Sequence, residues 1–129
     1  MINENQTKMK ENILKDKSFI FAVRIVNLYK YLCVESKEYI MSKQVMRSGT
    51  SVGAMVREAE YSESKADFIH KLAIAQKEIN ETLYWLELLQ ETKYISNKEF
   101  ESISLDATEI IKMITSSIKT VKSTLITNH

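Results

Sequence analysis

The stretch Arg47-Ser48-Gly49-Thr50-Ser51-Val52-Gly53-Ala54 holds both glycines of a 129-residue chain that contains no proline. A glycine-rich loop can bind phosphate through its backbone N–H groups, so this function is tested first. A P-loop requires a Gly-Lys-Ser or Gly-Lys-Thr ending between a strand and a helix. Here Gly53 is followed by Ala54 and Met55, and no strand pattern precedes the stretch. The sequence therefore excludes a P-loop at this position.

The glycines instead lie inside an amphipathic helical pattern over about residues 38–62. Glycine in a helix interior costs about 1 kcal/mol relative to alanine, so two of them require a compensating contact. The neighbouring serine and alanine residues also have small side chains. We therefore expect Gly49 and Gly53 to let another helix pack closely. The inward positions of this expected helix recur every three or four residues: Val45, Gly49, Val52, Val56 and Ala59.

Three further segments have the same helical period. Two of the expected starts carry capping signals, Ser64 with Asp67 and Ser96 with Glu99. The approximate ranges of the three helices are 17–35, 65–91 and 97–123. Their expected inward residues are Phe21, Ile25, Leu28 and Leu32 in the first, Phe68, Leu72, Ala75, Ile79, Leu83 and Leu86 in the third, and Phe100, Ile103, Ala107, Ile110, Ile114, Ser117 and Val121 in the fourth.

Four amphipathic helices joined by short turns predict an all-α protein, an antiparallel up-and-down four-helix bundle. We expect one domain, with the bundle at residues 17–125, a flexible N-terminal segment at 1–16 and a C-terminal tail at 126–129. The single cysteine, Cys33, excludes an internal disulfide and favours a reducing compartment. No apolar run is long enough to span a bilayer or to serve as a secretory signal. These features predict a cytoplasmic protein without a membrane partner.

Helix three carries a second stripe opposite its expected core face. Seven residues follow it at steps of three and four, and they include the only tryptophan of the chain. Tryptophan with aliphatic and charged neighbours is typical of a protein interface, so we expect this stripe to mediate self-association. The stripe is Asp67, His70, Ile74, Lys77, Glu81, Trp85 and Leu88, and the predicted oligomer interface is Ile74, Lys77, Glu81, Trp85 and Leu88.

The sequence offers no catalytic constellation. Asp67 and His70 have the spacing of one carboxylate–histidine ligand pair of a di-iron bundle, but such a site needs a second pair and two more inward carboxylates. Cys33 has no histidine base in its sequence context. We therefore predict a protein that is not an enzyme, without catalytic, metal-binding or cofactor-binding residues. A second hypothesis is a bundle that binds a metal or small ligand in its core.

One end of the expected bundle is basic. The start of helix one and the end of helix four meet there, although the acidic Glu58, Glu60 and Glu63 share the end and the chain as a whole carries a net charge of only +1. Several lysines of an oligomer could together bind the phosphates of a nucleic acid, or they could be ordinary solubilising charge. The residues predicted for nucleic-acid contact are Lys112, Lys119, Lys122, Lys15 and Lys17, with Lys8 and Lys10 nearby.

Four segments also carry a resemblance to a known family. Together they are similar to the bacterial four-helix-bundle proteins encoded in intervening sequences of 23S ribosomal RNA genes, over about residues 17–123. The segments are Lys43-Gln44-Val45-Met46-Arg47-Ser48-Gly49-Thr50-Ser51-Val52-Gly53-Ala54, Arg57-Glu58-Ala59, Ser64-Lys65-Ala66-Asp67-Phe68-Ile69-His70-Lys71-Leu72 and Glu81-Thr82-Leu83-Tyr84-Trp85-Leu86-Glu87-Leu88-Leu89.

The resemblance implies an up-and-down bundle that assembles as a ring-like homopentamer, and it brings no catalytic residues with it. A related protein, the accessory variability determinant of diversity-generating retroelements, is similarly pentameric and engages nucleic acid and a reverse transcriptase through a basic surface. By this resemblance the expected function is a non-enzymatic oligomeric scaffold or adaptor, and its expected partners are further copies of itself and RNA or a nucleic-acid-processing protein.

Overall fold

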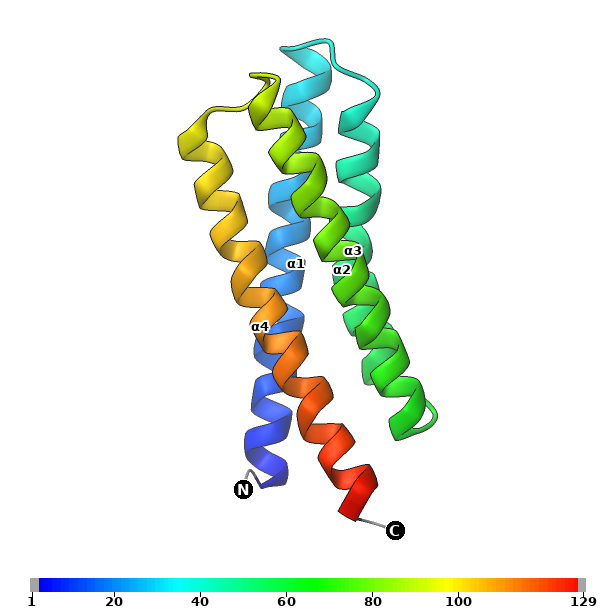
Figure 1. Cartoon of the computed structure of the whole chain (residues 1–129). Helices are drawn as coiled ribbons and strands as arrows, with labels where there is room; N and C mark the ends of the chain where they lie inside the picture. Colours follow the sequence, from blue (N-terminus) through cyan, green and yellow to red (C-terminus); the bar gives the residue numbers. More distant parts are fainter. Residues whose placement is uncertain (1–2, 128–129) are drawn as a thin grey trace.

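Four helices pack side by side in a computed structural model that describes residues 3–127. The chain runs up and down in turn, so that both termini and the α2–α3 turn lie at one end and the other two turns lie at the opposite end (Figure 1). Each helix packs against two others, in the cyclic order α1, α2, α3, α4. The prediction of an all-α, up-and-down four-helix bundle is confirmed. The helices are α1 (Glu4–Val34), α2 (Met41–Glu60), α3 (Lys65–Glu91) and α4 (Asn97–Thr127).

Helix α1 begins at Glu4, well before the expected start near residue 17. The side chain of Asn3 accepts a hydrogen bond from the backbone N–H of Gln6, and the side-chain oxygen of Gln6 accepts one from the backbone N–H of Asn3. These two bonds make a capping box that sequence reasoning missed. Leu14 is buried in the core. The expectation of a flexible segment up to residue 16 is therefore wrong for residues 3–16, because their own cap and core contacts extend the helix; residues 1–2 lie outside the described part.

The other helix bounds differ less from expectation. Helix α2 is shorter than expected at both ends, whereas α3 has the expected bounds. Helix α4 continues to Thr127, so the expected tail at 126–129 is helical for residues 126–127 and lies outside the described residues beyond them. The capping box of α4 is confirmed by hydrogen bonds in both directions between Ser96 and Glu99. At the start of α3, Ser64 accepts from the Asp67 N–H, but the Asp67 carboxylate accepts from Glu63 rather than from Ser64.

The core consists of most of the predicted inward residues with a few additions, and Phe100 and Val121 of α4 are only half-buried. All the predicted positions of the first two helices are buried. In α3 the core extends to Thr82 and Leu89, whereas Phe68 and Leu83 are half-buried and only border it. The Thr82 hydroxyl hydrogen-bonds the Ser48 hydroxyl at 2.9 Å, so the polar atoms of this buried α2–α3 contact are paired.

The two glycines lie against α1. A Cβ atom built at Gly49 would lie 2.8 Å from Cγ1 of Ile25, and one at Gly53 would lie 3.2 Å from the carbonyl oxygen of Ser18. Ile25 is fully buried, so its side chain has no free space into which it could move. Helices α1 and α2 thus lie so close together that a side chain at either glycine position would collide with α1.

Glu38 fixes the start of α2. Its buried carboxylate accepts hydrogen bonds from the backbone N–H groups of Ile40, Met41 and Ser42, so it satisfies donors that a helix leaves free at its first turn. Burial alone would raise the pKa of this carboxyl. The backbone N–H groups outweigh burial because they stabilise the charged form, and the pKa of Glu38 lies below its ordinary value of 4.5.

We predict that Gly49→Ala destabilises the protein by about 1–2 kcal/mol. The gain in helix propensity of up to about 1 kcal/mol is smaller than the cost of overpacking against Ile25, which is typically about 1–3 kcal/mol. Gly53→Ala should cost less, since its contact is longer. Urea denaturation measures both, and Ala54→Gly at a neighbouring exposed position isolates the propensity effect. A Gly49→Ala protein more stable than the wild type would contradict the close contact.

We predict that Glu38→Ala lowers the free energy of unfolding at neutral pH by about 2 kcal/mol, because three backbone donors lose a charged acceptor. Since the pKa of Glu38 is lowered by folding, its contribution is fully present above pH 4.5 and is lost as the pH falls through the folded pKa below that value. The stability difference between wild type and variant should therefore shrink in acid. Urea titrations from pH 7 to about pH 3 test this; a difference independent of pH would contradict it.

Candidate interaction surfaces

The interior offers no room for chemistry. Apolar side chains of all four helices fill it, and within residues 3–127 no group of three or more His, Cys, Asp or Glu side chains could hold a metal ion. His70 is exposed, and the Asp67 carboxylate accepts a backbone hydrogen bond in the α2–α3 turn, so the two residues do not converge on a site. No described helix is long and apolar enough to cross a bilayer. The features that could act on other molecules lie on the outside.

An open depression of about 570 Å³ lies at the α2–α3 turn. Charged groups there neutralise one another, since Lys71 lies 3.4 Å from Glu58. A groove of about 120 Å³ between α1 and α4 is similarly bordered by an ion pair, Lys17 with Glu109 at 2.9 Å. Both hollows are open at the surface and bordered by ion pairs rather than enclosed within the bundle core, where the small-ligand hypothesis would place its site.

Trp85 is less exposed than the sequence suggested. It lies half-buried against the core, and its indole N–H donates to the Glu81 carboxylate at 3.0 Å. Arg47 of α2 pairs with this same carboxylate and, at 3.2 Å, with Glu78. Its position on the stripe opposite the core face suggested an exposed ring, but the ring is half-buried. The reason is that the indole lies at the boundary between α2 and α3, where its N–H bonds Glu81 and Glu81 pairs with Arg47.

Tyr84 is the aromatic residue that α3 presents to solvent, and the sequence analysis missed it. Its ring is 57% exposed and meets the Trp85 ring edge-to-face with centroids 5.1 Å apart. Of the other residues in the predicted interface, Ile74 and Leu88 are half-buried beside it and Lys77 is exposed. The outer side of α3 thus combines an anchored aromatic pair with a polar border, which is the usual make-up of an interface.

Helix α1 has a second apolar face that the sequence analysis also missed. Besides Tyr31, six of its large apolar residues are more than two-fifths exposed, and α4 exposes one more. The signal was present in the sequence, since most of these residues recur at helical steps opposite the core face. The residues of α1 are Met9, Ile13, Phe19, Ile20, Val23 and Val34, and the α4 residue is Leu105.

Polar contacts hold α1 along both of its edges. On the α4 side, Arg24 donates to Asp106 and Ser102 at 2.8 and 2.7 Å. On the α2 side, the Arg57 guanidinium lies over the Phe19 ring, 5.3 Å from its centroid. These charged groups are thus bound along the edges of α1, so they leave its outward apolar face uncovered.

The expected basic end divides into paired and unpaired lysines. Lys15 and Lys17 form ion pairs with Glu60 and Glu109, at 3.5 and 2.9 Å, and so are less available to phosphate than the sequence suggested. Lys10 instead donates to the Ser116 hydroxyl at 2.6 Å, which joins α1 to α4 near their ends. The lysines that are exposed and form no ion pair with any described residue are Lys8, Lys112, Lys119 and Lys122.

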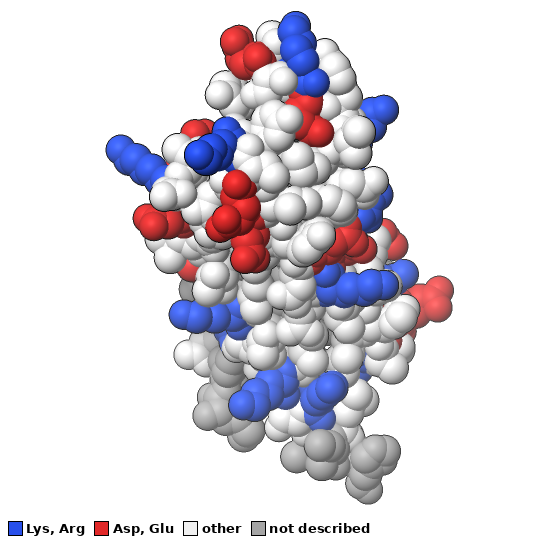
Figure 2. Space-filling model, turned by 45° about the horizontal axis from the view of Figure 1, so that its top comes forward, with Lys and Arg blue, Asp and Glu red and all other residues white. Residues whose placement is uncertain are grey.

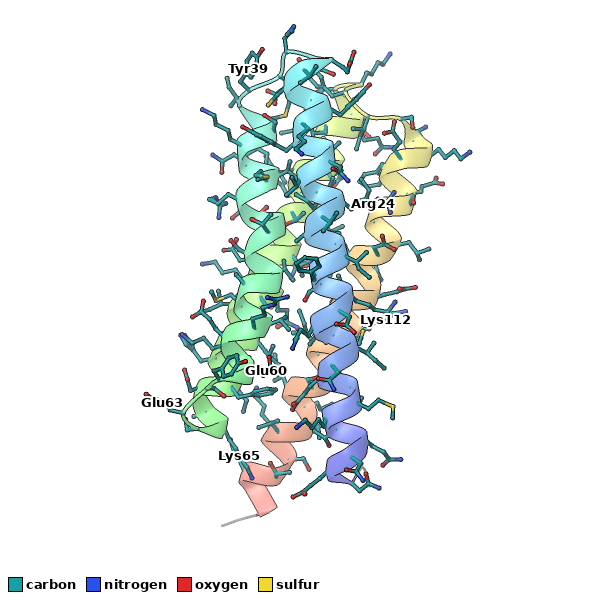
Figure 3. All side chains as sticks on the ribbon, turned by 180° about the vertical axis from the view of Figure 1, so that it is seen from behind. Arg24, Tyr39, Glu60, Glu63, Lys65 and Lys112 are labelled. Atoms are coloured by element: carbon teal, nitrogen blue, oxygen red, sulfur yellow. The ribbon has the colours of Figure 1, made fainter. Side chains whose placement is uncertain are left out.

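Lys8 lies near the start of α1, and Lys119 and Lys122 lie in the C-terminal part of α4, at the end of the bundle that holds both termini (Figure 1). Figure 3 places Lys112 on the α4 side, away from Glu60 and Glu63 by the α2–α3 turn, so the acidic residues offset it less than expected. In Figure 2, basic side chains occupy the lower part of the visible face without acidic neighbours. Burial raises the pKa of the Glu11 carboxyl, the Glu60 carboxylate raises it further and Lys8 lowers it.

The fold and its outward-facing features define an all-α bundle whose core is structural. Residues 10–116 match the 23S rRNA-intervening sequence protein family, and the chain belongs to this family. It is 63% identical to a protein of unknown function from the S23 ribosomal protein family of Bacteroides thetaiotaomicron VPI-5482, whose crystal structure superposes with a TM-score of 0.85. The match covers 85% of this chain and 98% of that one. No curated protein matches the chain.

Proposed function

We propose that this protein is a non-enzymatic scaffold or adaptor that assembles from several copies of itself. The observation that carries the proposal is the set of large apolar and aromatic side chains that a well-packed monomer leaves at its surface on α1 and α3. Contiguous apolar surface of this kind is rare in monomers and marks interaction sites.

The outer side of α3 is the surface that supports a ring. Trp85 is held by the Glu81 carboxylate, and Tyr84 stands beside it with little rotamer freedom to lose, so both rings are preorganised for contact. Leu88 and Ile74 extend the surface along the helix. The ring-like homopentamer implied by the family resemblance agrees with a heterologous contact of this face with a different face of the next copy.

We predict that light scattering of the purified protein gives a mass near five times the 15.0 kDa of one chain. Tyr84→Ala should weaken assembly by roughly 2 kcal/mol without unfolding the subunit, since the ring is mostly exposed. Trp85→Ala should weaken both assembly and stability because the indole also contacts the core. Tyr61→Ala, at a tyrosine that is 81% exposed by the α2–α3 turn, serves as the control. A 15.0 kDa species at micromolar concentration would refute the proposal.

A second candidate function is binding to the backbone of structured RNA. It is favoured by the exposed lysines along the C-terminal half of α4, Lys112, Lys119 and Lys122, which form no ion pair with a described residue. In α4, no acidic residue follows Glu109, so the C-terminal part of the helix carries basic charge alone among its ionisable groups in the described range. A ring would bring several such ends together and make weak phosphate contacts collective.

We predict that structured RNA binds the assembled protein at about 50 mM salt and far more weakly at about 200 mM, because phosphate binding releases counterions. Reversal of Lys112, Lys119 and Lys122 to glutamate should abolish the binding. The control is the same charge change at the opposite end, at Lys37, Lys43 and Lys98, which should leave most of the affinity. Binding that is absent at low salt, or indifferent to both reversals, would remove this second function.

A further inference from the structure

Helices α1 and α3 occupy diagonal corners of the bundle and run in the same direction. Within residues 3–127 they do not pack against each other, and each lies between α2 and α4. Both begin at the end of the bundle that holds the α2–α3 turn (Figure 1). In a ring whose copies all point the same way, α1 of one copy can therefore lie parallel to α3 of the next.

We propose that the outward face of α1 binds the outer side of α3 in the next copy of this chain, with the two helices parallel and at the same height. The inference rests on the proposed self-assembly and names the second face of the contact that α3 makes. Figure 3 shows α1 in front of the bundle with α2 and α4 on either side, so no other helix of the same copy covers this face. The α1 face consists of Met9, Ile13, Asp16, Ile20, Val23 and Lys30, all of them exposed.

The bundle itself determines which residues of the two faces stand at the same height. Leu14 of α1 and Leu72 of α3 line one hollow near the α2–α3 turn, and Tyr31 and Gln90 line another hollow at the opposite end. Each of these pairs marks a level that α1 and α3 share. Copies related by rotation about an axis along the bundle keep the same levels, because a pure rotation adds no shift along its axis.

The charges of the two faces are complementary at these levels. Counted along the helices, Asp16 stands within one turn of Lys77 of the next copy, and Lys30 stands between the levels of Glu87 and Glu91. All five side chains are exposed in the single copy. An antiparallel contact would instead bring Asp16 to the two glutamates and Lys30 to Lys77. Attraction between opposite charges therefore selects the parallel arrangement.

The apolar residues of the α1 face also find partners on α3. Tyr84 of the next copy stands between the levels of Val23 and Lys30, so its exposed ring can lie against both side chains. Ile20 stands beside the aliphatic stem of Lys77, which can cover it while the ammonium group reaches Asp16. The two remaining pairs, at the lower end of the contact, are Ile13 beside His70 and Met9 beside Ala66.

The shape of the bundle allows this contact to close into a ring. Each copy uses two different faces, so all contacts are the same and none is left over after the last copy. For a square bundle with helix axes about 10 Å apart, within a copy and across the contact, the helices nearest the centre of a five-copy ring stay more than about 10 Å apart. Five copies therefore close without overlap, with both chain ends of every copy on one side of the ring.

Two variants that each lose one face test the contact. The double substitution Ile20→Lys and Val23→Lys blocks the α1 face, and Tyr84→Lys blocks the outer side of α3. Each variant alone should be a monomer in light scattering at micromolar concentration. The control, Ile40→Lys, changes an apolar side chain that is 79% exposed outside both faces and should keep the wild-type mass. Circular dichroism melting verifies that each variant remains folded.

A mixture of the two blocked variants distinguishes this contact from any other that uses the same helices. One variant keeps its α3 side and the other keeps its α1 face, so a single intact contact remains. An equimolar mixture at sub-millimolar concentration should give a dimer of about twice the 15.0 kDa chain mass that grows no further. A mixture that stays monomeric, or blocked variants that keep the wild-type mass, overturns the α1–α3 contact and leaves a scaffold assembled through other faces. A monomeric wild type overturns the scaffold as well.

A charge swap tests the parallel arrangement. Asp16→Lys and Lys77→Asp each place like charges opposite one another and should weaken assembly several-fold, and the two together should restore it. In an antiparallel contact Asp16→Lys would face Glu87 and Glu91 and would strengthen assembly. Stronger assembly of that single variant, or the absence of rescue in the double variant, therefore overturns the parallel contact.

Discussion

The close contact between α1 and α2 at Gly49 and Gly53 is the constraint on which the rest of the molecule depends. Ile25 and the Ser18 carbonyl occupy the space that side chains at the two glycines would need. This contact brings α1 close enough to α2 for Lys15 to reach Glu60. Each glycine lowers the stability of α2 by about 1 kcal/mol relative to alanine. The dense packing that the glycines allow between α1 and α2 offsets this cost.

The same stretch of α2 organises its other neighbour. Ser48, next to Gly49, hydrogen-bonds Thr82 in the core, and Arg47 reaches over the surface to Glu78 and Glu81 of α3. The residues that carried the family resemblance therefore fasten α2 to both α1 and α3. In this structure they fix the two helices that present the exposed apolar surface.

The fold could be predicted because its signals are local and periodic. Apolar residues at steps of three and four defined four helices, and Ser96 with Glu99 marked a helix start by a hydrogen-bond pattern that sequence spacing alone determines. The N-terminal part of α1 was missed for a related reason. Its polar composition resembles a frayed end, and only its tertiary neighbours, which bury Leu14 and bind Lys10 to Ser116, make it a helix of the bundle.

The surfaces were harder to predict because they depend on how each helix is rotated. Helical period places Trp85 on a stripe, but it does not reveal that Arg47 and Glu81 draw the indole towards α2 and leave Tyr84 as the exposed ring. Ion pairs between helices cannot be read from a sequence either. Lys17 forms one with Glu109, whereas Lys112 forms none with a described residue. In α1, the core positions were predicted from the helical period, but the apolar residues on the opposite face were not interpreted as an exposed surface.

The placement of the three surfaces bears on how they could work together. The aromatic pair of α3 and the exposed apolar residues of α1 belong to helices that run along the sides of the bundle, whereas Lys119 and Lys122 belong to the C-terminal part of α4, at the end that holds both termini (Figure 1). Contacts along the sides leave the ends open, so assembly would concentrate lysines rather than bury them. A ring through α3 would set all basic ends on one side. Such an assembly would offer phosphate groups a single binding face on which the lysines of all copies act together.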